Sequence, residues 1–93
     1  MRTAKVTVSL HATLRTASCS EGCVVDASDL IELRAALTDR YGLGFGEMLG
    51  SPGSPFGKTV VLVNGLVVPS ESTGDVVLRD GDEVSIFPPI SGG

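Results

Sequence analysis

Residues 59–68, TVVLVNGLVV, contain the clearest fold signal in the chain. Residues 59–63 carry apolar side chains on both faces, a pattern typical of a strand that is covered on both sides. The pair Asn64 and Gly65 is a strong signal for a two-residue hairpin turn, and residues 66–68 supply the returning strand. The stretch therefore predicts a central strand joined to an antiparallel neighbour.

Segments near both ends of the chain alternate as half-buried strands do. Residues 83–87 follow a turn at 80–82 and direct two apolar side chains to one side, which makes them the last strand. Residues 5–10 place three apolar side chains on one face, and residues 23–26 can form a short second strand. An N-terminal hairpin and a C-terminal strand are therefore predicted.

The helix signals lie between these strands. Ser28 or Asp29 can cap a helix, Glu32 completes a capping box with Asp29, and Gly42 supplies a left-handed stop. We therefore expect a helix over residues 29–41. Its apolar residues recur at helical spacing along one stripe, which predicts packing against the sheet. The stripe consists of Leu30, Leu33, Leu37 and Tyr41.

Residues 42–58 are rich in glycine and proline. This composition is too broken for a long helix and predicts an exposed loop, with at most one short helical turn at 45–49. Two patterns here imitate nucleotide-binding loops. Residues 53–59 are one residue short of the phosphate-binding motif and lead into a strand, and the glycines at 42, 44 and 46 follow a helix instead of opening one. Neither pattern predicts a nucleotide site.

The predicted order of elements is strand, strand, helix, strand, strand, strand. This order indicates an α+β fold of the β-grasp type, with a mixed sheet of about five strands and one main helix packed on one face. A chain of 93 residues supports one hydrophobic core rather than two. We expect a single domain over residues 1–87 and a flexible, extended C-terminal tail over residues 88–93.

The composition excludes several classes of function. Eleven acidic against seven basic residues give a net charge of −4, so neither nucleic acid nor an anionic membrane surface is an expected partner. No apolar run is long enough for a signal peptide or a membrane span, and a cytoplasmic location is the expectation. His11 is the only histidine, which leaves no Ser/His/Asp triad. Cys19 and Cys23 lack the further ligands of a metal site, so we expect reduced thiols, with a labile disulfide as the alternative.

The C-terminal tail carries the functional signal. Pro88 and Pro89 restrict the backbone to extended geometry and direct the chain away from the sheet. Gly92 and Gly93 have no Cβ, so the last two residues can enter a narrow channel and expose the terminal carbonyl to a nucleophile. The alternative is a frayed end without a special function, because the composition of termini is weakly constrained.

Residues 80–93, DGDEVSIFPPISGG, resemble the C-terminus of the small subunit of molybdopterin synthase, the MoaD-like proteins, and of the related ThiS-type ubiquitin-like sulfur carriers. The resemblance extends to residues 12–15, 40–42 and 62–65 and so covers nearly the whole chain. Only the glycine-rich segment matches loosely.

This resemblance implies a carrier whose working group is the carboxylate of Gly93, preceded by Gly92. A ubiquitin-activating-type adenylyltransferase, MoeB- or ThiF-like, would use ATP to form a Gly93 acyl-adenylate. Sulfur from a persulfide donor would then convert the adenylate into a thiocarboxylate. A MoaE-like large subunit of molybdopterin synthase would receive the tail in molybdenum or tungsten cofactor biosynthesis. The chain itself would bind no cofactor or metal and would be no enzyme by itself.

The resemblance also implies a partner-binding surface around the tail. Its predicted members are Phe87, Pro88, Pro89, Ile90, Ser91, His11 and Arg15. Strand alternation places Phe87 opposite the core-facing residues, so an exposed anchor and core packing are both open. His11 stands where the family often has an aromatic residue that contacts partners, and an ordinary solvent-facing histidine is the alternative. Arg15 is expected near the partner surface, and the alternative is a side chain that is simply solvated.

Other functions share the same C-terminus. The carrier can deliver sulfur to thiamine thiazole, to cysteine or to thiolated tRNA, or the chain can be a modifier that is conjugated through Gly93 to lysines of target proteins. A third alternative is a β-grasp docking module that is never acylated and binds through its sheet face. Retention of activity without Gly92 and Gly93 would favour the docking module.

Overall fold

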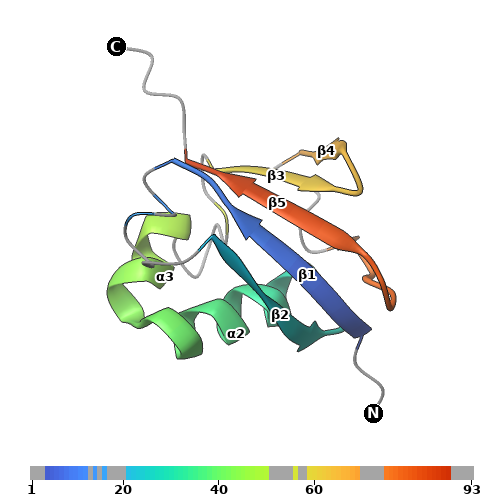
Figure 1. The fold of residues 1–93 in the computed structure, drawn as a ribbon, viewed down its shortest axis with the longest axis horizontal. Helices are drawn as coiled ribbons and strands as arrows, with labels where there is room; N and C mark the ends of the chain where they lie inside the picture. The colour runs from blue at the N-terminus through green and yellow to red at the C-terminus, as the bar shows by residue number, and fades with distance from the viewer. Residues whose placement is uncertain are drawn as a thin grey trace.

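Within the described residues, five strands form one mixed sheet and two helices cover one of its faces (Figure 1). The computed structural model describes residues 4–12, 14, 16, 21–50, 56, 59–69 and 75–88. In chain order the elements are β1 (Ala4–Leu10), β2 (Gly22–Ala27), α2 (Leu30–Tyr41), α3 (Leu43–Leu49), β3 (Val60–Val63), β4 (Leu66–Val68) and β5 (Glu83–Phe87). The sheet order is β2-β1-β5-β3-β4. The predicted β-grasp is confirmed, with a second helix beside the main one.

Strands β1 and β5 run parallel in the interior of the sheet, and the other neighbouring pairs are antiparallel. Their register places Val8 beside Val84 and Leu10 beside Ile86, and these four side chains are at most 1% exposed. Because side chains alternate along a strand, this row faces the helices. The N-terminal hairpin and the C-terminal strand are confirmed.

The prediction that residues 59–63 form the central strand is wrong. Strand β5 occupies the middle of the sheet, and β3 lies between β5 and the edge strand β4. The apolar side chains on both faces of β3 therefore do not indicate a central position in the sheet. Val61 faces the core at 1% exposure, whereas Val60 and Leu62 lie on the opposite face and are only half-buried.

Helix α2 begins and ends as the sequence predicts. Asp29 Oδ1 accepts a hydrogen bond from the Glu32 N–H at 2.8 Å, which is the first half of the predicted capping box. Glu32 Oε1 accepts in return from the N–H of Ser28 at 2.8 Å, one residue before the N-cap. At the other end the Gly42 N–H donates to the Thr38 carbonyl at 2.7 Å. The stripe of Leu30, Leu33 and Leu37 is 0% exposed, and burial of each leucine contributes roughly 1.5–3 kcal/mol relative to exposure.

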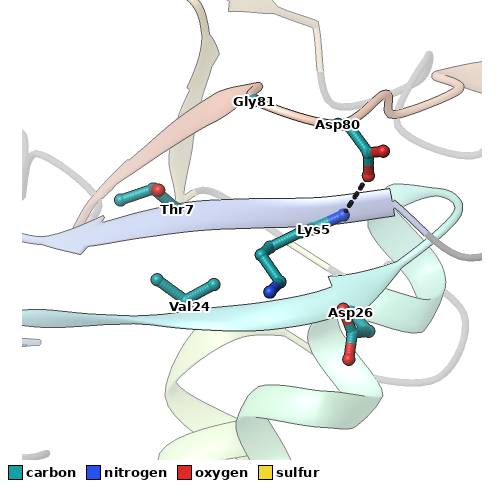
Figure 2. Close-up of a pocket in the computed structure, with 6 residues that line it drawn as sticks. All are labelled: Lys5, Thr7, Val24, Asp26, Asp80 and Gly81. Carbon is teal, nitrogen blue, oxygen red and sulfur yellow. Dashed lines mark hydrogen bonds between the residues drawn. The ribbon is translucent and has the colours of Figure 1, made fainter.

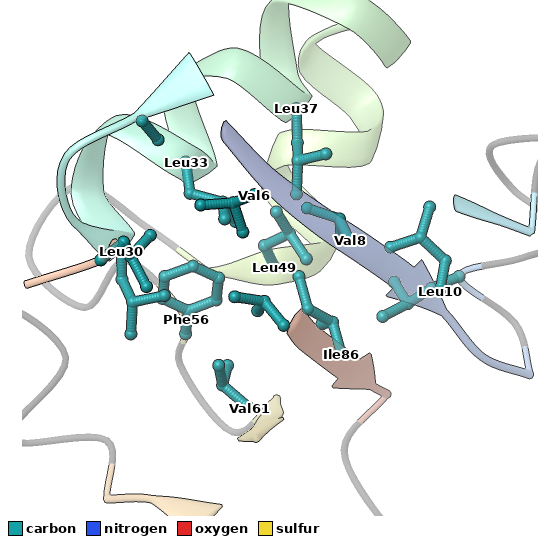
Figure 3. Close-up of a cluster of buried hydrophobic side chains, with 14 of the residues drawn as sticks. Val6, Val8, Leu10, Leu30, Leu33, Leu37, Leu49, Phe56, Val61 and Ile86 are labelled. Atoms are coloured by element: carbon teal, nitrogen blue, oxygen red, sulfur yellow. The ribbon is translucent and has the colours of Figure 1, made fainter. Parts of the chain in front are cut away.

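The prediction of an exposed loop over residues 42–58 is wrong for its first half. Residues Leu43–Leu49 form α3, and its Phe45 is buried. Leu49 lies in the core with Phe56, which comes later in the same segment (Figure 3). Arg34 on α2 donates through Nη2 to the carbonyls of Gly46 and Gly50 at 3.2 and 3.0 Å. A side chain of α2 therefore holds the C-terminal end of α3 in place.

Asn64 and Gly65 form the predicted hairpin turn with φ angles of 52° and 84°. The side chain of Asn64 also reaches the start of β5. Its Oδ1 accepts from the Glu83 N–H at 2.9 Å, and its Nδ2 donates to Asp82 Oδ1 at 3.0 Å. The turn therefore sets the register of β5 as well as that of β4. No helix among the described residues has the length and apolarity needed to cross a membrane.

Candidate functional site

The parallel pairing of β1 and β5 brings the ends of both strands to the same edge of the sheet. Leu10 is level with Ile86, and the His11 N–H donates to the Ile86 carbonyl at 3.2 Å. On the other side of β5, Phe87 pairs with Val60 at the start of β3. Strand β5 therefore ends, and Pro88 leaves the sheet, between His11 and Val60. We call this place the tail exit.

At the tail exit the imidazole of His11 stacks on the ring of Phe87. The ring centroids are 4.1 Å apart and the planes differ by 9°. Phe87 remains 36% exposed, whereas His11 is half-buried and its Nε2 atom is buried and has no hydrogen-bond partner among the described residues. A phenyl ring held flat against a neighbour loses little freedom on binding, which suits an anchor for a partner. The core-packing alternative for Phe87 is not the one observed.

The sheet face that the helices leave uncovered, which we call the open face, has two different halves. Near the tail exit it carries an apolar patch, defined as Val60, Leu62, Val67 and Phe87. Val60 pairs with Phe87 and Leu62 pairs with Val67, so the four side chains adjoin across three strands. The far half carries charged and exposed residues instead, namely Lys5, Asp26 and Glu83.

The described structure includes only some of the predicted site residues. His11, Phe87 and Pro88 are brought together at the tail exit. Arg15, Pro89, Ile90, Ser91, Gly92 and Gly93 lie outside the described residues, as does Cys19. Cys23 has a free thiol. No group of three His, Cys, Asp or Glu side chains that could hold a metal ion occurs in the described part of the chain.

Sequence reasoning missed three members of the apolar patch. Val60, Leu62 and Val67 were assigned to strands without a role at a surface. A signal was present, because residues 59–63 are apolar on both faces, whereas helices that pack on one side of a sheet can cover only one of these faces. The other face was therefore available for a partner.

A five-stranded mixed sheet with β1 and β5 parallel, helices on one face and an open apolar face beside the C-terminal strand defines a ubiquitin-like β-grasp protein. The sequence model of the ThiS family matches residues 8–93. The chain therefore belongs to the ThiS family, a family of ubiquitin-like sulfur carriers and modifiers that act as small subunits of complexes. A search of curated protein sequences gave no match.

Solved structures agree with this assignment. The small archaeal modifier protein 1 of Methanosarcina acetivorans is 29% identical, with a TM-score of 0.84 and complete coverage of both chains, 100% each. A chain in the BexX/CysO complex of Amycolatopsis orientalis is 25% identical, with a TM-score of 0.79 over 95% of this chain and 99% of that one. A chain in the complex of subunits 1 and 2 of the molybdopterin-converting factor of Helicobacter pylori is 28% identical, with a TM-score of 0.65 over 96% and 99%.

Proposed function

We propose that this chain is a sulfur carrier whose Gly93 carboxylate is adenylated and then thiocarboxylated, and that it is the small subunit of molybdopterin synthase. The observation that carries the proposal is the tail exit. A chain that ends in Gly92-Gly93 leaves the sheet beside an exposed aromatic anchor and an apolar patch. This arrangement gives a partner both a docking surface and a thin reactive end.

The proposed chemistry needs no side chain of the carrier. A carboxylate is a poor electrophile until one oxygen becomes part of a good leaving group. A MoeB- or ThiF-like adenylyltransferase supplies that group by transferring AMP from ATP to Gly93, with release of pyrophosphate. The terminal sulfur of a persulfide donor then attacks the acyl carbon and AMP leaves, which gives an acyl disulfide between Gly93 and the donor. A thiol reduces this S–S bond by forming a disulfide with the donor sulfur, and the Gly93 thiocarboxylate remains as a soft nucleophile. ATP is bound by the partner, and the carrier holds no cofactor.

The partner in the final step is proposed to be a MoaE-like large subunit, in which the thiocarboxylate transfers sulfur to a pterin precursor. Support for this kind of partner comes from the likeness to a chain of the two-subunit molybdopterin-converting factor. Phe87 with its His11 support would dock beside the channel that accepts Pro88, Pro89, Ile90 and Ser91. Since activation consumes ATP, the proposal also assigns the chain to the cytoplasm.

Intact mass spectrometry tests the proposal. The chain is incubated with its adenylyltransferase, ATP, a persulfide donor and a thiol reductant, beside a truncated chain that lacks Gly93. A gain of about 16 Da on the full chain alone, from one oxygen exchanged for sulfur, is the expected result. Addition of the large subunit and the precursor should then return the mass to its initial value. No gain with an enzyme that is active on another carrier would favour the non-acylated docking module.

A second candidate is a protein modifier, favoured by the likeness to small archaeal modifier protein 1. The same activated Gly93 would then form isopeptide bonds with lysines of target proteins. Sulfur delivery to cysteine, thiamine or tRNA is a related possibility, and the likeness to a chain of the BexX/CysO complex keeps it open. A thiocarboxylate that is consumed only with the pterin precursor would separate the molybdopterin role from these.

A further inference from the structure

A shallow hollow of about 590 Å³ lies on the charged half of the open face, at the end of the sheet away from the tail exit (Figure 2). Its lining residues are Lys5, Thr7, Val24, Asp26, Asp80 and Gly81. The Lys5 backbone N–H donates to Asp80 Oδ1 at 2.8 Å, and the Gly81 N–H donates to the Lys5 carbonyl at 3.0 Å. These bonds fix the Asp80 carboxylate at the rim of the hollow.

The amino group of Lys5 is an available nucleophile in this hollow. Lys5 is exposed, and no ion pair holds its amino group in the described part of the chain. In the β1–β2 register Lys5 lies directly opposite Asp26, so the two side chains are neighbours on the open face. Figure 2 shows the Lys5 side chain extending toward β2, where Asp26 lies. The chain has two lysines in all, Lys5 and Lys58, and Lys58 lies outside the described residues.

We propose that Lys5 is an acceptor site for the activated Gly93 of a second copy of this chain, which would link two copies through an isopeptide bond. The inference rests on the proposed adenylation of Gly93. The Lys5 amine, after loss of a proton, attacks the carbonyl carbon of the acyl-adenylate. A C–N bond forms, the C–O bond to AMP breaks, and AMP leaves with the electron pair. The released protons pass to solvent, with Asp26 or Asp80 as the first acceptor.

The shape of the hollow favours a glycine end as the incoming group. Gly92 and Gly93 carry no Cβ, so an extended backbone can lie against Val24 and Thr7 without side-chain clashes. The carboxylates of Asp26 and Asp80 can accept hydrogen bonds from its N–H groups. An acyl-adenylate is an activated ester, and the nearby carboxylates assist by removing the proton that an ammonium group must lose before it attacks.

The donor is a second copy because of the direction of the strands. Lys5 is level with Gly81, and from there the chain runs six residues to Phe87, the last residue of β5, a span of about 20 Å. The six residues 88–93 of the same chain would have to reverse at once and run fully extended across the open face to return to Lys5. A second molecule reaches the hollow without such a reversal.

Tryptic mapping tests the inference. The chain is incubated with its adenylyltransferase and ATP but without a sulfur donor, and pyrophosphate release is followed in the same tube. Arg79 is the last basic residue before the C-terminus, so trypsin leaves residues 80–93 as a branch on the modified lysine. Modification at Lys5 blocks cleavage there, and the expected product is the peptide of residues 3–15 that carries this branch.

Three variants make the result specific. Lys5→Arg should abolish the branched peptide while pyrophosphate release continues, and Lys58→Arg should leave it unchanged. Asp26→Asn should slow its formation by on the order of tenfold, because one proton acceptor is lost. Pyrophosphate release without a branch at Lys5, or with a branch at Lys58 alone, would overturn this inference and leave the proposed activation standing. Absence of pyrophosphate release would overturn both.

Discussion

The imidazole of His11 lies parallel to the ring of Phe87 at a centroid distance of 4.1 Å, although the two residues are far apart in the sequence. The contact exists because β1 and β5 are parallel neighbours whose ends coincide. It holds an exposed aromatic ring at the point where the tail leaves the sheet. The proposed docking anchor, Phe87, therefore stands six residues before the proposed reactive end, Gly93, in the sequence.

Phe87→Ala should weaken binding to the partner subunit without unfolding the domain. Exposed aromatic anchors beside a binding site commonly contribute about 2 kcal/mol or more, so we expect roughly a thirtyfold rise in Kd by isothermal titration calorimetry. Leu43→Ala is the matched control, because Leu43 is 77% exposed on the helical side of the molecule. An equal loss of affinity in both variants would contradict a specific role for Phe87.

His11→Ala should produce a smaller loss of affinity than Phe87→Ala, because the imidazole acts by holding the phenyl ring. His11→Phe should restore most of the affinity, since a second aromatic ring can maintain a stacked contact worth about 0.5–1.5 kcal/mol. The same titration measures both variants. If His11→Phe binds as weakly as His11→Ala, the partner recognises the imidazole nitrogens and not the stacked ring surface.

The two glycines inside α3 should respond to alanine in opposite directions. A Cβ on Gly44 would meet nothing within 4 Å, so Gly44→Ala should stabilise the domain by about 0.5–1 kcal/mol through helix propensity. A Cβ on Gly46 would lie 2.5 Å from Thr38 Oγ1, and Gly46→Ala should destabilise by about 1–3 kcal/mol. Thermal unfolding measures both changes, and a second substitution, Thr38→Ala, should rescue Gly46→Ala.

Asp82 should make stability depend on pH in the acid range. The hydrogen bond from Asn64 Nδ2, with a second from the Arg79 backbone N–H, lowers the pKa of Asp82 below its ordinary value of 3.8. A lowered folded-state pKa stabilises the fold fully above the unfolded value, and this contribution is lost as the pH falls through the folded value. Asp82→Ala should therefore cost about 1–2 kcal/mol at pH 7, and less at pH values below the ordinary pKa.

Urea unfolding of the native chain and Asp82→Ala at pH 7 and in acid measures this difference. Asp39→Ala serves as the control, because Asp39 is exposed on α2 and its carboxylate forms no hydrogen bond within the described residues. If the difference in free energy of unfolding between the native chain and Asp82→Ala stays constant on acidification, the hydrogen bonds of Asp82 do not favour its charged form.

The hairpin and α3 show what local sequence can and cannot predict. Asn64 and Gly65 accept positive φ angles, so the turn is encoded in two adjacent residues. Helix α3 is only seven residues long and contains Gly44 and Gly46, which lower its intrinsic propensity. It persists because Phe45 and Leu49 are buried, and such tertiary contacts leave no local pattern.

The candidate site likewise has one part that is inferred from local sequence and another part that depends on the tertiary fold. The prediction for the tail rests on proline and glycine, whose backbone properties do not depend on their surroundings, and it stays a prediction because residues 89–93 lie outside the described residues. The stack of His11 on Phe87 depends on the parallel pairing of the first and last strands, which no alternation pattern within either strand reveals. The apolar patch likewise required the sheet order, since Val60 and Phe87 adjoin only when β3 and β5 are neighbours.

Arg34 supplies the last prediction, because one guanidinium joins the two helices. Its Nη2 donates to the carbonyls of Gly46 and Gly50 at the C-terminal end of α3, where the Gly46 carbonyl also accepts from the Gly50 N–H at 3.3 Å. A cation there also interacts favourably with the helix dipole. Arg34→Met keeps the apolar stem and removes both hydrogen bonds, so it should cost about 1.5–3 kcal/mol and expose the amides of α3 to faster hydrogen exchange. Arg40→Met, on the last turn of α2, is the control and should leave exchange in α3 unchanged. Equal acceleration along both helices in Arg34→Met would mean that global unfolding, rather than release of α3, follows from the loss of this contact.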